Sequence, residues 1–256
     1  MSTDRITYVG HATALIELDG VRVLTDPVFR PRLLKVIVRQ HPEPDPGIAE
    51  RIDAVLISHL HHDHLDFASL RRIGLEVPIV APAGAGRVIR RRGFEQVIEL
   101  GTGQATNVGG LEVRATAAIH DGRRHKLGPK VDSAGYLLGS GARLVYFAGD
   151  TDLFDGMQDL AGDIDVALLP IAGWGPKVGS GHLDPRRAAA AAAMLRPRRA
   201  IPIHWGTLLR FDLGRRGDEL LHAPARRFVA QLAERAPDVE AIVLEPGESL
   251  ELSPPA

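Results

Sequence analysis

The segment from Ala54 to His64 constrains this chain more than any other. Ala54 to Ser58 is a short apolar, β-branched run, typical of a strand buried on both faces. His59-Leu60-His61-His62-Asp63-His64 follows at once and places five ionisable groups in six residues. Polar groups buried without partners cost several kcal/mol, and a bound metal ion would remove that cost. Residues two apart in an extended segment share a face, so we expect His59 and His61 to hold one ion together. Asp63 and His64, after a turn, are expected to reach a second ion.

The chemistry of these side chains limits which metals could bind. Imidazole nitrogen and carboxylate oxygen without thiolate suit Zn, Mn, Fe or Ni. The alternative to a metal site is a solvated polyhistidine loop that binds metal only by accident. The chain has 11 histidines and no cysteine. Disulfides, cysteine-based zinc sites and a thiol nucleophile are therefore excluded.

Composition limits the partners of the chain. Lys and Arg number 31 against 32 Asp and Glu, so there is no overall electrostatic reason to bind nucleic acid or an anionic membrane. The 256 residues suffice for one sizeable core, and we expect a single domain over residues 1–256. No apolar run approaches the roughly 20 residues needed to span a bilayer, and no signal peptide is recognised at residues 1–9. A cytoplasmic protein is expected.

Strand and helix signals alternate in two successive passes along the chain. A hairpin is expected around Asp19-Gly20, and helices are expected after the N-cap Asp66 and from Pro185. The other helices are predicted at 84–92 and 224–235, and the proline-rich segment 27–47 is predicted to be a long surface loop with one short helix. Strands are predicted at 6–9, 14–18, 21–24, 54–58, 78–80, 96–100, 111–118, 135–138, 143–147, 166–169, 200–203 and 241–244. This order favours an α/β fold, a four-layer αββα sandwich in which helices cover two sheets.

The motif His59, His61, Asp63 and His64 resembles the His-x-His-x-Asp-His signature of the metallo-β-lactamase-fold hydrolases. That family supplies a further His, a bridging Asp and a last His, each at a strand end. The corresponding positions here are His120, Asp150 and His204, and the resemblance covers essentially the full length.

Three further segments resemble one branch of that family. They are Gly10-His11-Ala12-Thr13, Leu24-Thr25-Asp26-Pro27 and His204-Trp205-Gly206-Thr207. The branch includes relatives of ascorbate-phosphate lactonase and the phospholipase D type that hydrolyses N-acyl phosphatidylethanolamines. Its members divide between phosphodiester and lactone substrates, so the resemblance fixes the fold and the metal site better than the substrate.

The resemblance implies a dinuclear metal-dependent hydrolase. It places His59, His61 and His120 on one divalent ion, Asp63, His64 and His204 on the other, and Asp150 between them. Zinc is the first choice of metal, with Mn or Fe as alternatives, and a metal-bridging hydroxide would be the nucleophile. The expected substrate is a phosphodiester or a related ester or lactone, small or lipid-like, and no nucleic-acid partner is expected.

Asp63 and His182 are the candidate catalytic residues. His182 precedes a helix and either contacts the substrate or protonates the leaving group, or it is a loop residue beside the cap Asp184. Asp26 either orients a ligand histidine or is a turn residue, and His11 either lines the site or packs in the core.

Several other residues complete the expectations. Trp174 either walls the pocket or belongs to the core, and residues 27–47 are expected to form its lid. His62 is expected to point away from the metals, and surface positions are expected for His41, His125 and His222. Two other functions stay open: an RNA-processing nuclease of the same fold, using the basic residues Arg87, Arg90, Arg91 and Arg92, and a non-catalytic metal- or ligand-binding protein.

Overall fold

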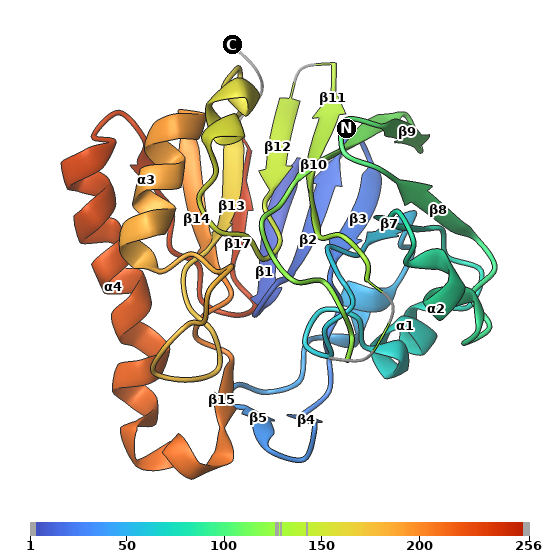
Figure 1. Cartoon of the computed structure of the whole chain (residues 1–256), viewed down its shortest axis with the longest axis horizontal. Helices are drawn as coiled ribbons and strands as arrows, with labels where there is room; N and C mark the ends of the chain where they lie inside the picture. The colour runs from blue at the N-terminus through green and yellow to red at the C-terminus, as the bar shows by residue number, and fades with distance from the viewer. Residues whose placement is uncertain (1–3, 126–127, 129, 142, 253–256) are drawn as a thin grey trace.

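Two seven-stranded sheets lie face to face in the computed structural model, which describes residues 4–125, 128, 130–141 and 143–252 (Figure 1). The first sheet has the order β17-β1-β2-β3-β6-β7-β8, and the second has the order β16-β14-β13-β12-β11-β10-β9. The first consists of β1 (Arg5–Gly10), β2 (Thr13–Leu18), β3 (Val21–Thr25), β6 (Ala54–Leu56), β7 (Ile79–Pro82), β8 (Val97–Leu100) and β17 (Ser249–Glu251). The second consists of β9 (Ala105–Val108), β10 (Leu111–Ala117), β11 (Ala134–Ser140), β12 (Arg143–Phe147), β13 (Val166–Pro170), β14 (Arg199–Ile203) and β16 (Glu240–Ala241).

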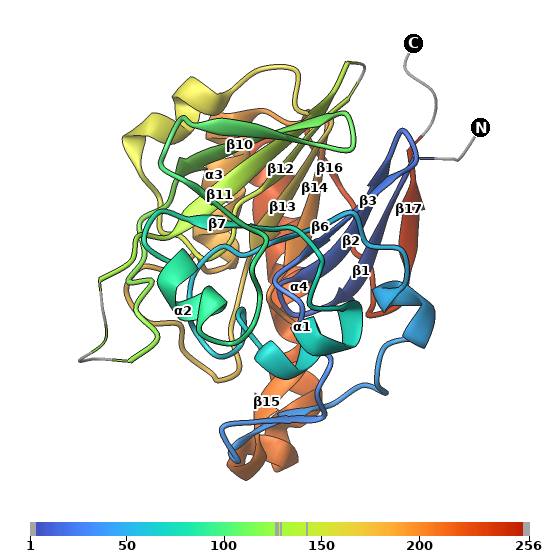
Figure 2. The same cartoon turned by 90° about the vertical axis from the view of Figure 1, so that its right-hand side faces the viewer.

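Helices cover the outer face of each sheet. The helices α1 (Phe67–Ile73) and α2 (Gly86–Arg90) lie on the first sheet, and Figure 2 shows them in front of it. The helices α3 (Pro185–Leu195) and α4 (Gly217–Arg235) lie on the second sheet, on the opposite side of the molecule (Figure 1). Two 3-10 helices, η2 (Asp155–Leu160) and η3 (Phe211–Arg216), connect elements of the second half. The predicted four-layer αββα sandwich is confirmed.

Strand β6 shows how the sequence produces these layers. Ala54 and Leu56 belong to the core between the two sheets, whereas Val55 packs with Leu70 of α1 on the outer side. Successive side chains of a strand point to opposite faces, so a strand covered on both sides is apolar at every position. The uninterrupted apolar run that predicted a buried strand therefore has its cause in the two layers that cover it.

The segment 27–47 is more ordered than the predicted loop. The strands β4 (Arg32–Leu33) and β5 (Ile37–Arg39) form a small antiparallel hairpin, and β5 also pairs with β15 (Leu208–Arg210). The one short helix is the 3-10 helix η1 (Pro46–Ala49). Leu33 and Ile37 are buried against Leu208. Packing against a segment about 170 residues away in sequence decides this structure, which is why no local signal revealed it.

The C-terminal part corrects two predictions. Helix α4 begins at Gly217 and has Pro224 inside it, not at its start. A proline removes one backbone hydrogen bond, but the buried side chains recur at helical intervals on both sides of it and hold the helix together. These side chains are Leu221, Ala225, Phe228 and Leu232. The strand predicted at 241–244 is reduced to β16, and β17, which was not predicted, pairs antiparallel with β1.

The local signals at turns and caps are confirmed. Asp19 and Gly20 both have positive φ, as a two-residue hairpin turn requires, and Asp66 caps α1 by accepting a hydrogen bond from the Ser69 N–H at 3.0 Å. Among the described residues, no helix has both the length and the apolar character needed to cross a membrane.

Candidate metal centre

The predicted ligands meet at one edge of the sandwich. His59 to His64 lie between β6 and α1, while His120, Asp150 and His204 follow β10, β12 and β14. Strands β12 and β14 run parallel to β13 between them, and β10 has the same direction because two antiparallel pairings connect it to β12. Their carboxyl ends therefore share one edge of the second sheet, opposite the end of β6 in the first.

The first group contains His59, His61 and His120. One nitrogen of each ring lies within 4.8 Å of those of the other two. His120 Nδ1 donates to the Gly181 carbonyl at 2.9 Å, which leaves Nε2 unprotonated, 3.2 Å from His61 Nδ1. A histidine held in this way by a backbone carbonyl has the tautomer that a metal requires.

The second group contains His11, Asp63, His64 and His204, again with ligand atoms within 4.8 Å of one another. The Nε2 atoms of His64 and His204 are 3.1 Å apart. His204 Nδ1 donates to the Ala172 carbonyl at 2.7 Å, and His64 Nδ1 lies 2.7 Å from a carboxylate oxygen of Asp26. Both rings therefore turn Nε2 toward the interior of the group.

Asp150 lies between the two groups. Its carboxylate oxygens are 3.2 Å from His64 Nε2, 3.3 Å from His204 Nε2 and 3.4 Å from His182 Nε2. The position agrees with the place between two ions that the resemblance implied. Figure 1 shows the loops that follow β12 and β13 converging on this edge of the molecule.

Asp26 and Ser58 orient two of the histidines from behind. The Asp26 carboxylate accepts hydrogen bonds from Ser58 N at 2.7 Å and Ser58 Oγ at 2.5 Å, in addition to the one from His64. Ser58 Oγ then accepts from His59 Nδ1 at 3.0 Å. The expected contact of Asp26 with a histidine of the motif is thus observed. Ser58 was not singled out from the sequence, although a serine that ends an apolar strand just before the motif is a usable signal.

Two buried atoms of this cluster have no hydrogen-bond partner among the described residues: His59 Nε2 and Asp150 Oδ1. Leaving a buried donor or acceptor unsatisfied costs about 1–3 kcal/mol, and native proteins rarely do so without a reason. His59 Nδ1 is occupied by Ser58, so the free Nε2 is a lone pair aimed into the cluster. A divalent cation fits this arrangement of nitrogen and oxygen donors.

The electrostatics of the cluster, in the absence of a bound ion, favour the metal-binding protonation state at most of its groups, with His64 as the exception. Burial lowers the pKa of His59 well below its usual range, that of His61 to about 4 and that of His204 to about 3, so these rings are neutral at pH 7. Burial alone would raise the pKa of Asp150, but His204 and His64 outweigh it and hold that pKa well below the usual range. Burial alone would lower the pKa of His64, but Asp150 and Asp26 outweigh it and hold that pKa well above the usual range, so this ring is protonated at pH 7 when no ion is bound. Neutral imidazoles and ionised carboxylates are the forms that coordinate cations, so His64 would release its proton on binding one.

A cavity of about 540 Å³ opens onto the cluster. Trp174 lines it with 37% of its surface exposed and donates from Nε1 to Asp63 at 3.2 Å, so it walls the cavity and is not a core residue. Leu34, between β4 and β5, also lines the cavity, as a lid segment would. His182 also lines the cavity and forms a further group with His120 and Asp150, and its pKa is raised because the hydrogen bond to Asp150 outweighs burial.

The remaining histidines are now placed. His11 is buried, and its Nε2 lies 3.0 Å from Asp63 Oδ2, so it is both packed and part of the site. His62 is absent from the ligand groups and accepts from Arg124 at 2.9 Å, with Nδ1 away from the cluster. Of the three histidines expected at the surface, His125 is exposed, whereas His41 and His222, the latter in α4, are half-buried.

Arg124 was not among the residues predicted from the sequence to belong to the site. One of its nitrogens donates to the carbonyls of Leu60 at 3.0 Å and Leu65 at 2.9 Å, which closes the loop that carries the motif. Of the four basic residues Arg87, Arg90, Arg91 and Arg92, Arg90 pairs with Glu99 and Arg92 lies over the Phe67 ring.

Comparisons with known proteins agree with this geometry. Residues 21–205 match the family model described as beta-lactamase superfamily domain. A UPF0173 metal-dependent hydrolase of Methanopyrus kandleri is 34% identical over 263 residues, which cover 96% of this chain and 99% of that protein. An uncharacterized protein of Mycobacterium tuberculosis is 34% identical over 223 residues, 79% of this chain, and the chain spans only 58% of that relative.

Solved structures share the fold. Igni18, a metallo hydrolase from Ignicoccus hospitalis, has a TM-score of 0.72 and 26% identity, with 98% of this chain and 99% of that one covered. CmlA, a diiron beta-hydroxylase from Streptomyces venezuelae, has a TM-score of 0.73 at 20% identity and is covered to 55% of its length, against 98% of this chain. At that identity the likeness shows the fold alone, and the fold occurs with more than one chemistry.

Proposed function

The chain belongs to the metallo-β-lactamase superfamily, and on that premise we propose that it is a dinuclear metal-dependent hydrolase of a phosphodiester or a related ester or lactone. The observation that carries the proposal is that two buried atoms, His59 Nε2 and Asp150 Oδ1, make no hydrogen bond to any described residue, within a cluster where His120 and His204 turn a free nitrogen inward. His59, His61 and His120 would hold one ion, Asp63, His64 and His204 the other, and Asp150 would lie between them.

The chain's own residues have separate tasks in this proposal. Two divalent ions, zinc in the first place, would supply Lewis-acid polarisation and water activation when bound. Asp63 has a catalytic as well as a ligand role, since its carboxylate faces the cavity and is held there by His11 and Trp174. The carbonyls of Gly179 and Ser180 lie 3.3 Å and 3.2 Å from His182 Nδ1 and direct Nε2 inward, where it would protonate the leaving oxygen.

The cavity supports a small-molecule or lipid-like substrate. Trp174 and Leu34 give it an apolar wall, and the candidate metal ligands form its polar floor. The proposal keeps residues 1–256 as one hydrolase domain in the cytoplasm. The branch suggested by the segments around His11, Asp26 and His204 stays a prediction.

The test is metal content followed by hydrolysis. We expect about two divalent ions per chain by elemental analysis and metal-dependent hydrolysis of bis-(p-nitrophenyl) phosphate or a lactone. Asp150→Asn and His59→Ala should lower activity by at least about a hundredfold. His41→Ala, the same change outside the ligand groups, should leave activity intact. A metal-loaded protein that is inert toward the whole ester, lactone and phosphodiester panel would favour the non-catalytic alternative.

The role of His182 has its own readout. If it protonates the leaving group, His182→Gln should reduce kcat strongly for alkyl esters, whose leaving oxygens need a proton, and only weakly for p-nitrophenyl esters. An equal loss for both kinds of leaving group would assign His182 to substrate binding.

A further inference from the structure

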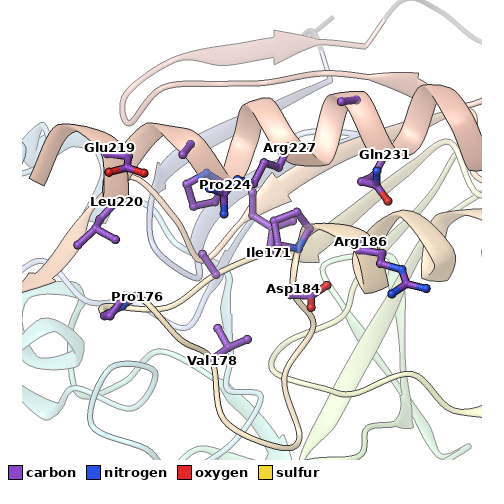
Figure 3. Close-up of a pocket in the computed structure, with 15 residues that line it drawn as sticks. Ile171, Pro176, Val178, Asp184, Arg186, Glu219, Leu220, Pro224, Arg227 and Gln231 are labelled. Carbon is purple, nitrogen blue, oxygen red and sulfur yellow. The ribbon is translucent and has the colours of Figure 1, made fainter. Parts of the chain in front are cut away.

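A second cavity, of about 500 Å³, lies between α3, α4 and the segment 171–184 (Figure 3). Gly175, Pro176 and Val178 line both this cavity and the one that opens onto the metal cluster. Residues 175–178 therefore form a common wall between the two cavities. The volume lies within the range of about 300–1,000 Å³ that small-molecule sites occupy.

One face of α4 supplies much of the lining. Glu219, Ala223, Arg227 and Gln231 follow one another at intervals of four residues, which places them on the same side of the helix. Figure 3 shows Glu219 and Leu220 at one end of the cavity and Arg186 and Gln231 at the other. Between these ends the lining includes the apolar residues Ile171 and Pro224.

Two guanidinium groups line this cavity, those of Arg186 in α3 and Arg227 in α4. Both residues are exposed, and neither guanidinium makes a hydrogen bond or an ion pair with any residue in the described ranges. The neighbouring Arg187 differs, because it pairs with Asp152 and donates to the His182 carbonyl at 3.4 Å. Arg186 and Arg227 thus line one cavity from two separate helices.

The acidic residues of the lining only partly neutralise them. Asp184 is the N-cap of α3, and its carboxylate accepts from the Arg187 N–H at 2.8 Å, so the positive end of the helix dipole partly offsets its charge. Glu219 precedes Arg227 by eight residues, which is about 12 Å along a helix. That separation exceeds the Debye length of about 8 Å at physiological ionic strength. Away from Glu219, the lining therefore carries two guanidinium groups against the one capped carboxylate of Asp184.

We propose that this cavity binds a small organic anion whose acidic group pairs with Arg186 and Arg227 and whose apolar body lies beside Pro224. Carboxylate, sulfonate and phosphate groups all match the planar, multiply donating guanidinium. An occupant would also contact residues 175–178, which belong to the same loop as Trp174 and His182.

A matched pair of fluorescent probes tests the proposal. The anion 8-anilinonaphthalene-1-sulfonate and its uncharged analogue N-phenyl-1-naphthylamine share one aromatic body. We expect the sulfonate to bind the full chain more tightly, and Arg186→Gln or Arg227→Gln to weaken sulfonate binding by about threefold to tenfold. The same variants should leave the uncharged probe unaffected. Arg91→Gln removes an equal charge from the C-cap of α2, away from this cavity, and is the control.

Hydrogen exchange gives a second readout that locates the occupant. Saturating sulfonate probe should slow amide exchange in peptides covering 173–182 and 219–231, and in the Arg227→Gln variant this protection should be lost. Equal affinity of the two probes for the parent chain would overturn the proposal. So would Arg186→Gln and Arg227→Gln variants that bind the sulfonate as the parent does, or protection confined to other segments.

Discussion

The substitution Asp26→Asn, which replaces one carboxylate oxygen by an amide nitrogen, should weaken the candidate metal centre more clearly than any other change of this kind. Its carboxylate is fully buried and accepts three hydrogen bonds, two from Ser58 and one from His64 Nδ1. All three partners are donors. In Asp26→Asn one oxygen becomes an NH₂ group, so at least one of these donors must face another donor.

The size of the effect follows from that mismatch. One unsatisfied buried donor costs about 1–3 kcal/mol, which should appear as an equal loss in the free energy of unfolding. His64 escapes the mismatch only by moving its proton from Nδ1 to Nε2, and a protonated Nε2 cannot bind a metal. We therefore expect the affinity for one ion to fall by about tenfold to a hundredfold, or about 1.4 to 2.8 kcal/mol.

The assay is competition for zinc with a chromophoric chelator, accompanied by thermal unfolding with and without EDTA. Asp26 has a positive φ of 34°, a conformation that asparagine also adopts readily, so backbone strain does not complicate the comparison. Asp45→Asn is the control, since Asp45 accepts one exposed hydrogen bond from Gly47 N. If Asp26→Asn binds zinc as tightly as the parent, then Asp26 does not orient His64 and the reasoning is wrong.

Two further predictions concern stability. Gly149 precedes Asp150 with a φ of 59°, and a Cβ there would come within 2.5 Å of Ser58 Cβ. Gly149→Ala should therefore lower the free energy of unfolding, measured in a denaturant titration, by about 1–3 kcal/mol. Gly162 has open space around it, so Gly162→Ala should not lower the free energy of unfolding. The pKa of Glu99 is lowered from 4.5, because hydrogen bonds from the Gly86 N–H and Arg90 outweigh the opposing effect of burial. A carboxyl group whose pKa is lower in the folded state stabilises the fold at pH values above its unfolded-state pKa. This stabilisation is lost as the pH falls through the folded-state pKa. The Tm difference between parent and Glu99→Gln should thus be largest near pH 7 and disappear toward about pH 3, and a constant difference would contradict the assignment.

Local patterns predicted most of the elements because their causes are local. The apolar run at β6, the turn at Asp19-Gly20 and the cap at Asp66 each depend on residues within a few positions, and each is confirmed. Strand β17 and the hairpin β4–β5 were missed because their pairing partners, β1 and β15, are far away in the sequence. Short strands have little intrinsic preference of their own and depend on such partners.

The same distinction applies to the site. Ser58 and Arg124 orient the motif through hydrogen bonds, and Arg124 does so across about 60 residues of sequence. No spacing rule connects Arg124 to Leu60 and Leu65. This contact exists because the fold brings the segment after β10 next to the segment after β6, at one edge of the two sheets.

By itself the sequence determined the donor chemistry, because 11 histidines and no cysteine leave only nitrogen and oxygen ligands, and it determined that the donors follow buried strands. The tertiary structure decided which donors meet. It set His11 at 3.0 Å from Asp63, turned His62 to Arg124, and buried His59 Nε2 without a protein partner. The physical reason is that strand alternation is a property of neighbouring residues, whereas a ligand group needs side chains from separate strands, and only the packing of two sheets brings those together.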